Sequence, residues 1–586
     1  MAVETPRRVR AASVAEVEAA GRLVVALEGN TVCLIAENGE VHAVDNRCPH
    51  MGFPLHRGSV EDGIITCHWH DARFDLCSGG TLDQWADDLR CFPVEVEGDD
   101  VFVDLTPPED PVGHQRQRLY DGLRHDIPLV LAKSTVALVD HDPRCVQAFC
   151  AGLEFGALRR GGGWFRGLTT LTCLMNLAPR VDVNERAAAL YHGIADVAAD
   201  SAGELPRFPL DPLSGLVSAG PVRLGRWFRQ CIEVRDAEGA ERVLVSAVRA
   251  GASTEDLADV LFTAATDHRY LDGGHTLDFV NKACEALDTA GWHRAEGVLT
   301  ALPPQLAFAE RMEEASAWRY PADLVALLED AFERLPTPAP TGEWVGRNEL
   351  VDVVLTSEEA SETVEAVLVA LHEGAGAVEV ASAVSFAAAT RIARFPTSNE
   401  FQDWDTALHT FSFANAVEQG LRRLPSRALL RGALDAAISA HLDRFLNVPA
   451  ARLPVADEGA DPDALLAELP VLLDRQQAVE EAGQLVASYL GAGGDPDRLV
   501  AALVGCLLRE DRNFHTIQCV EAGVHQHELL RGTGEEGLPL IAAARYLAAH
   551  APTPRSQHQT YDIARRLHRG ERVYEEEPAP PEGEPG

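Results

Sequence analysis

The chain contains Cys48-Pro49-His50 and, sixteen residues later, Cys67-His68-Trp69-His70. Each segment offers one thiol and one imidazole, spaced CxH in the first and CxxH in the second. Short alternating apolar runs flank both segments, so we expect two hairpin loops that bring the four side chains together. Zinc also binds two cysteines and two histidines, but zinc fingers usually space them CxxC and HxxxH. The alternation of Cys and His over two loops therefore favours another metal centre.

The sequence around these loops resembles the Rieske ferredoxins, the soluble electron donors of bacterial aromatic-ring dioxygenases. The similarity runs from about residue 8 to 105 and includes VDNR (44–47), CPHMGFPL (48–55), CHWHDARFDLCSGG (67–80) and FPVEVEGDDVFVD (92–104). It implies a small all-β domain with a [2Fe–2S] cluster. Two thiolates would bind one iron and two imidazoles the other, which raises the reduction potential. Zinc or an empty remnant is the alternative. The implied ligands are Cys48, His50, Cys67 and His70.

One difference from a related family is informative. Respiratory-complex Rieske proteins carry an extra cysteine in each loop, and the two form a disulfide. The matching positions here hold Phe53 and Trp69, so the resemblance is to the ferredoxin type and suggests a lower potential. His68 lies between two ligands and is expected to face solvent.

Size and charge limit the function classes. The chain has 586 residues, 46% of them apolar, and a formal net charge of −39. This length predicts two or more domains. So negative a field repels nucleic acid and anionic membranes and attracts a cationic redox partner. The sequence contains no run of 18 apolar residues, so no membrane-spanning helix is predicted. A secretory signal would also require an apolar segment after the N-terminal arginines, and none follows them. We therefore expect a cytoplasmic protein.

The composition changes along the chain. Residues 22–105 show short alternating strands separated by turns such as Asn38-Gly39, which completes a Rieske domain over 1–105. The Pro-rich residues 106–117 read as a linker. Helical periodicity dominates 118–570 and predicts a large all-α domain. The acidic, Pro-rich residues 571–586 are expected to be a disordered tail.

The helical region contains a weak internal repeat of helix pairs. In three copies an amphipathic helix is followed by a second helix expected to open with His: HTLDFVN (275–281), HTFSFAN (409–415) and HTIQCVE (515–521). A looser fourth copy ends in HGIADVA (192–198). If the four pairs are related by pseudo-symmetry, His192, His275, His409 and His515 would converge on one site.

Such a site would suit a metal. Each histidine has an acid about one helical turn away, namely Asp196, Asp272, Asp405 and Asp511. The acid would either ligate the metal or orient the imidazole. We therefore consider a second metal, iron, or haem in the helical domain. The alternative is that the repeated His is a structural or substrate-contacting feature. Two further histidines, His525 and His527, are two residues apart and are expected at the surface.

Two functions from different classes follow. In the first, the protein is an oxygenase-like oxidoreductase whose cluster passes single electrons from an external reductase to a metal or small-molecule substrate site in the helical domain. Fusion of donor and acceptor in one chain would raise their effective concentration. In the second, it is a non-enzymatic electron carrier or redox sensor whose helical domain docks a partner protein. The first is preferred, and convergence of the four histidines in a pocket would discriminate between them. The sequence leaves the oligomeric state open.

Overall fold

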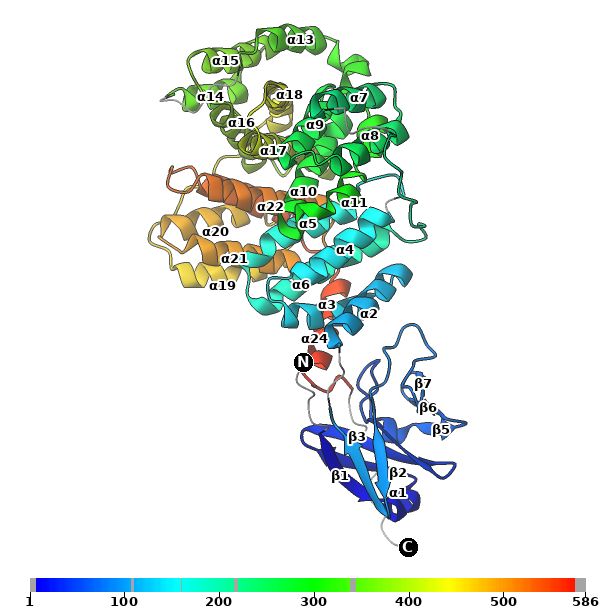
Figure 1. Cartoon of the computed structure of the whole chain (residues 1–586). Coiled ribbons are helices and arrows are strands. Elements are labelled where there is room, and N and C mark those ends of the chain that lie inside the picture. Colours follow the sequence, from blue (N-terminus) through cyan, green and yellow to red (C-terminus); the bar gives the residue numbers. More distant parts are fainter. Residues whose placement is uncertain (1–6, 107–109, 160, 215–219, 338–343, 575–586) are drawn as a thin grey trace. The chain divides into compact units, whose positions relative to one another are not determined.

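The computed structural model describes residues 7–106, 110–159, 161–214, 220–337 and 344–574. The chain divides into two compact units. Unit 1 comprises residues 1–141 and 559–586, and unit 2 comprises residues 142–558. Figure 1 follows the chain from the N-terminal strands into the helices. The predicted combination of a small β domain followed by a large helical region is confirmed.

In the described part of unit 1, ten strands form three antiparallel sheets, with orders β1-β10-β9, β2-β3-β4-β8 and β5-β6-β7. The strands are β1 (Arg8–Ser13), β2 (Arg22–Leu27), β3 (Asn30–Glu37), β4 (Glu40–Asp45), β5 (Ser59–Glu61), β6 (Ile64–Thr66), β7 (Arg73–Asp75), β8 (Cys91–Phe92), β9 (Val94–Glu97) and β10 (Asp100–Asp104). The predicted turn at Asn38-Gly39 joins β3 to β4, and both residues have positive φ (51° and 83°), as a tight hairpin turn requires.

Helices complete unit 1, and their positions differ from the domain boundaries that the sequence predicted. Those lying wholly within unit 1 are α1 (Val14–Ala20), α2 (Pro111–His125) and α3 (Pro128–His141). The linker predicted at 106–117 is wrong from residue 111 onward, because Asp110 caps α2 and Pro111 stands at its first position, where proline is well tolerated. Residues 118–141, assigned from sequence to the all-α domain, cluster with the Rieske region instead. Of the predicted tail, residues 575–586 lie outside the described residues.

Unit 2 is helical throughout its described elements. Its helices are α4 (Val146–Leu158), α5 (Arg166–Leu177), α6 (Val183–Asp200), α7 (Pro221–Glu233), α8 (Ala237–Arg249), α9 (Thr254–Thr266), α10 (His275–Ala290), α11 (Ala295–Leu299), α12 (Pro303–Phe308), α13 (Leu324–Arg334), α14 (Arg347–Thr356), α15 (Ala360–His372), α16 (Ala377–Ala393), α17 (Phe401–Arg423), α18 (Arg427–Leu442), α19 (Pro462–Leu472), α20 (Val479–Gly491), α21 (Pro496–Leu508), α22 (Phe514–Leu529), α23 (Gly537–Ala549) and α24 (Ser556–His568). Residues of α24 from 559 onward are counted with unit 1.

Four helices form the centre of unit 2. Helix α10 packs against α17 and α5, and α22 packs against the same two helices. Helices α10, α17 and α22 share a sequence pattern, because each is the second helix in one copy of the repeat. The first helices, α9, α16 and α21, bury an apolar stripe, as the sequence predicts; in α9 the stripe includes Leu257, Leu261 and Ala265.

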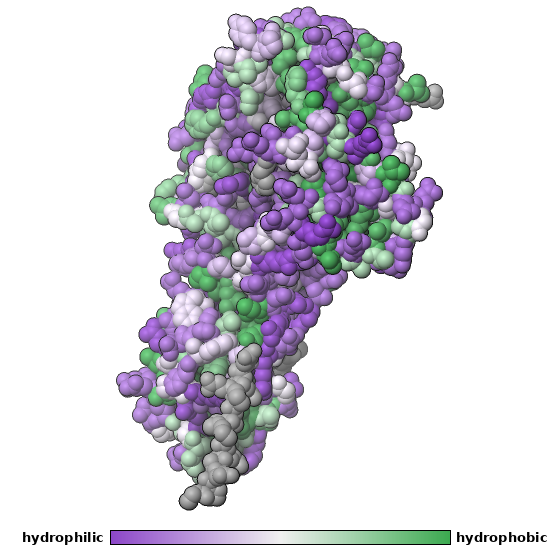
Figure 2. All heavy atoms as spheres, turned by 180° about the vertical axis from the view of Figure 1, so that it is seen from behind, coloured by the Kyte–Doolittle hydropathy of each residue, from purple (hydrophilic) through white to green (hydrophobic). Residues whose placement is uncertain are grey.

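The face of the molecule drawn in Figure 2 carries both hydrophilic and hydrophobic residues. Figure 2 shows hydrophilic residues over much of the visible face, which agrees with the net charge of −39. Among the described residues, no helix combines the length and the apolar character needed to cross a bilayer.

Candidate metal centres

Two loops at one end of an apolar core hold the four predicted cluster ligands in unit 1. The first loop follows β4, and the second joins β6 to β7. Each loop closes on itself: Cys48 N–H donates to the Phe53 carbonyl, and Cys67 N–H to the Ala72 carbonyl, both at 2.8 Å. Gly52 takes a φ of +77°, which glycine adopts without strain. Backbone hydrogen bonds within each loop and the glycine at position 52 therefore contribute to the shape of the loops.

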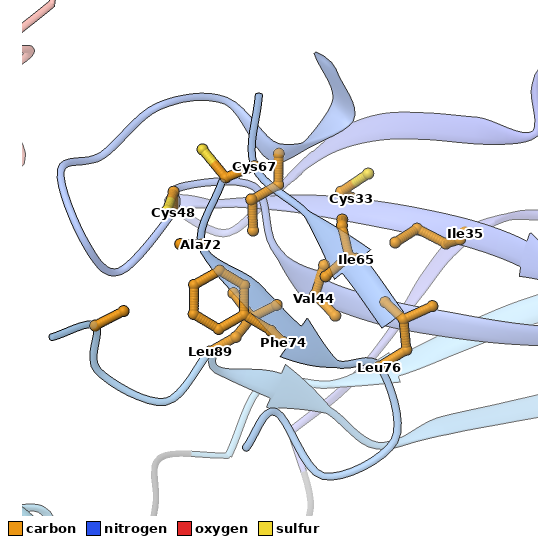
Figure 3. Close-up of a cluster of buried hydrophobic side chains, with 12 residues drawn as sticks. Cys33, Ile35, Val44, Cys48, Ile65, Cys67, Ala72, Phe74, Leu76 and Leu89 are labelled. Carbon is orange, nitrogen blue, oxygen red and sulfur yellow. The ribbon is translucent and has the colours of Figure 1, made fainter. Parts of the chain in front are cut away.

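The two thiols meet in a nearly solvent-free place. Cys48 and Cys67 are each 2% exposed, and Figure 3 shows them beside buried residues such as Phe74 and Ile65. The thiol of Cys48 hydrogen bonds to Cys67, and backbone N–H groups two and three residues further along each loop donate to each sulfur. These bonds lower the pKa of Cys67 to about 6, whereas pairing with Cys67 raises the pKa of Cys48. The surroundings thus favour the thiolate form of Cys67, the form that a metal ligand needs.

The two imidazoles lie beside each other, with ring centroids of His50 and His70 5.0 Å apart. Burial, with His70 as a smaller influence, lowers the pKa of His50 to about 4, so this ring is neutral at pH 7. Its Nδ1 is buried and has no hydrogen-bond partner among the described residues, as expected for an atom reserved for a metal. His68 is exposed and lies 3.0 Å from Ser59 Oγ, as predicted for a residue that is not a ligand. Two thiols and two imidazoles therefore fit a [2Fe–2S] cluster.

Helices beyond the β domain brace the first loop. Lys133 of α3 donates to the Pro49 carbonyl, next to Cys48, and to the carboxylate of Asp87. Arg118 of α2 donates to the same carboxylate at 2.6 Å. The two cations lower the pKa of Asp87 despite its burial. Sequence reasoning missed these contacts, because no motif links an α3 lysine to a loop 84 residues away.

Aromatic rings cover the positions where respiratory-type Rieske proteins carry their disulfide. The ring centroids of Phe53 and Trp69 lie 5.8 Å apart, and Tyr574 lies 5.4 Å from Phe53 and 5.9 Å from Trp69. Apolar packing here takes the place of the covalent link between the two loops.

Comparison with known proteins identifies this domain. The model of the Rieske [2Fe–2S] domain matches residues 7–93. The chain is 32% identical over 103 residues to the ferredoxin component of the naphthalene 1,2-dioxygenase system of Pseudomonas aeruginosa, covering 17% of this chain and 99% of the ferredoxin. The chain belongs to the Rieske [2Fe–2S] family.

Two further relatives match a short stretch of this chain. Human Apoptosis-inducing factor 3 is 39% identical over 80 residues, which cover 14% of this chain and 13% of that protein. The structure of the Sphingomonas yanoikuyae B1 ferredoxin matches with 27% identity and a TM-score of 0.16, covering 17% of this chain and 99% of the ferredoxin.

A second cluster of histidines forms in unit 2. His275, His409 and His515 come from α10, α17 and α22, and their potential ligand atoms all lie within 4.8 Å of one another. The two Nε2 atoms of His409 and His515 are 3.1 Å apart. Burial, and then the neighbouring histidines, lower the pKa of His275 to about 3 and of His409 to about 4. The rings of His275 and His409 are therefore neutral at pH 7, and the potential ligand atoms of all three histidines lie close together.

Asp405 supports this triad, although not as the sequence suggested. Asp405 precedes His409 by four residues, but its Oδ2 lies 3.3 Å from Nδ1 of His515 on the neighbouring helix. The hydroxyl of Tyr546 donates to its other oxygen at 2.5 Å. Asp272 and Asp511, expected beside His275 and His515, instead accept backbone N–H groups.

The predicted convergence of four histidines is wrong for His192. This residue lies within α6, and its neighbours include Asp511 and His558. The reason is topological: α5 takes the fourth place beside α10 and α22, and α6 packs against α4, α5 and α21. The expectation that each second helix opens with His is also wrong for His192 and His409, which lie inside α6 and α17.

Sequence reasoning missed a further group, Glu285, Glu521 and His525, whose ligand atoms also lie within 4.8 Å of one another. His525 is half-buried and His527 is fully buried, so their predicted surface position is wrong. One signal was available, because Glu521 and His525 are four residues apart and share a helix face.

Proposed function

We propose that the protein is an oxidoreductase that receives electrons in its Rieske domain from an external reductase and uses them at a metal ion bound by His275, His409 and His515. The observation that carries this proposal is the meeting of three imidazoles from helices about 110 to 240 residues apart in the chain. A bound [2Fe–2S] cluster supplies one electron at a time. Relatives that serve as ferredoxin components of dioxygenase systems support an electron-transfer role for the domain.

A single ion suits the triad better than haem. Ligand nitrogens bound at 2.0–2.1 Å in tetrahedral geometry lie roughly 3.3 Å apart, close to the 3.1 Å between His409 Nε2 and His515 Nε2. The ring centroids of the three histidines are only 4.4 to 5.5 Å apart, which leaves no room for a flat macrocycle between them. Three protein ligands also leave coordination positions for a small-molecule substrate, as catalytic metal sites do.

Asp405 would position this site. A carboxylate that accepts the second ring N–H of a ligating histidine fixes its tautomer and makes it a stronger donor. The contact between Asp405 and Nδ1 of His515 leaves Nε2 of that ring directed toward His409. Tyr546, by donating to Asp405, holds the carboxylate in place.

The metal content of anaerobically purified protein tests the proposal. Iron and acid-labile sulfide per chain are measured together with the EPR spectrum of the dithionite-reduced form. We expect two sulfides, more than two irons, and a fall to two irons in His275→Ala/His409→Ala. His192→Ala is the matched control, because it removes a buried histidine outside the triad.

A second candidate is an electron carrier without a reaction of its own. It is favoured by the match to a separate ferredoxin over 99% of that ferredoxin's length. Two irons and two sulfides per chain, with a Rieske signal and no other transition metal, would support the carrier and overturn the triad metal site.

A further inference from the structure

A cavity of about 580 Å³, open to solvent, lies among the central helices of unit 2. Its lining comes from α5, α10, α17 and α22 and includes Asn176, Glu285, Gln419, Glu521 and His525. His275 and Glu285 are ten residues apart on α10, which places them roughly 15 Å apart along the helix axis. The cavity is therefore a different place from the histidine triad.

Three potential donors converge at the wall of this cavity. Glu285 comes from α10, while Glu521 and His525 lie one turn apart on α22. Both hydrogen bonds to Glu521 end on Oε1, from Asn176 at 2.9 Å and Lys282 at 2.8 Å. Its Oε2 accepts none from the described residues, and no described residue hydrogen bonds to His525. The group thus retains an unused oxygen and an unused imidazole.

The surrounding contacts fix the two carboxylates in place. Lys282 is 1% exposed and bridges them, with its Nζ 2.9 Å from Glu285 and 2.8 Å from Glu521. Asn281 donates to the other oxygen of Glu285 at 2.7 Å. Asn176, on α5, donates to both glutamates. Ligands held by such partners are already oriented before an ion arrives.

The net charge of the donor group favours the binding of one more cation. Two glutamates and one lysine sum to one negative charge, at a site where little water screens it. The other acids of the cavity are already paired, Asp288 with Arg423 and Glu528 with Arg180 at 3.1 Å. The amide nitrogen of Gln419 on the same wall is buried and has no hydrogen-bond partner among the described residues.

We propose that Glu285, Glu521 and His525 bind a divalent transition-metal ion, with its remaining coordination positions open to the cavity. The donor set selects the class: carboxylates suit Mg²⁺, Ca²⁺ and Mn²⁺, whereas an imidazole suits Fe²⁺ and Zn²⁺ rather than the alkaline-earth ions. Two carboxylates with one imidazole therefore suit Mn²⁺ or Fe²⁺. This site does not depend on the proposed function, since it shares no ligand with the triad.

Titration with Mn²⁺ tests the site directly, because free Mn²⁺ gives an EPR signal that weakens on binding. The host is the full-length His275→Ala/His409→Ala protein, which removes binding at the triad. Titrations are run with millimolar Mg²⁺ present, to saturate surface acids. We expect one tight site per chain, and at least tenfold weaker binding after adding Glu521→Gln or His525→Ala. Glu528→Gln, on the same cavity but outside the donor group, should bind like the host.

Two test variants are used so that the experiment still decides the question if one of them misfolds. Glu521→Gln removes a charge from the buried Lys282 contact, so its fold is checked by circular dichroism. His525→Ala breaks no hydrogen bond among the described residues and decides the question if the first variant unfolds. Equal Mn²⁺ affinity in the host and in His525→Ala, or no tight site in the host, would overturn the proposal. Because the host lacks the triad, neither result bears on the proposed function.

Discussion

Replacing Lys282 by Met tests the charge arrangement in the centre of unit 2. Lys282 is the cation that bridges Glu285 and Glu521, and the three side chains are 1%, 14% and 3% exposed. Methionine has a similar length and shape, so the packing changes little. The substitution therefore isolates the loss of one charge between two buried carboxylates.

The expected cost follows from these contacts. Removing one partner of a buried ion pair typically destabilises a protein by about 3–5 kcal/mol, because an unpaired charge stays buried. Asn176 and Asn281 still donate to the carboxylates, which keeps the cost near the lower end of that range. A second change, Glu521→Gln, removes one of the two unpaired charges and should recover part of the loss.

Urea unfolding followed by far-UV circular dichroism measures the effect, with EDTA present to remove bound ions. For a slope of about 3 kcal/mol/M, the midpoint of Lys282→Met should fall by about 1 M or more. The Lys282→Met/Glu521→Gln protein should lie between the single variant and the wild type. A loss below about 1 kcal/mol, or a double variant less stable than Lys282→Met, would refute the reasoning.

Three other outcomes are expected. Cys67→Ala should abolish the Rieske EPR signal. Cys33→Ala, at a buried cysteine of the same core, should keep the signal. Loss of the signal in both variants would contradict the ligand assignment. Asp405→Asn should weaken metal binding at the triad about 10- to 100-fold, because His515 loses its carboxylate partner. The iron of the cluster should not change. Metal retention on dialysis equal to that of the wild type would count against this expectation. Burial raises the pKa of Asp435 from about 3.8 to about 7. Above pH 4 the unfolded chain releases this proton while the folded protein keeps it until about pH 7, so stability falls across that window, by up to about 4 kcal/mol. In Asp435→Asn this contribution should be absent, and urea midpoints that change in parallel with the wild type between pH 4.5 and 7.5 would exclude the explanation.

The two kinds of site differ in how far the sequence predicts them. The cluster loops could be predicted because each is a closed turn of a few residues, and β6 and β7 hold the second loop through local pairing. The helical class and the apolar stripes followed from periodicity. The second helices were also correctly singled out by their repeated histidines, since three of those histidines meet.

The sequence by itself thus determined the local chemistry: the Cys and His donors, the turns that present them, and the helices that carry the other histidines. Only the tertiary structure decided which side chains meet. It put α5 rather than α6 beside α10 and α22, which excluded His192 from the triad. It directed Asp405 to His515 on another helix, and it joined Glu285 to Glu521 and His525, which follow it by 236 and 240 positions. Spacing along a helix fixes which residues share a face, but the face a helix turns toward its neighbours depends on packing against segments far away in the chain.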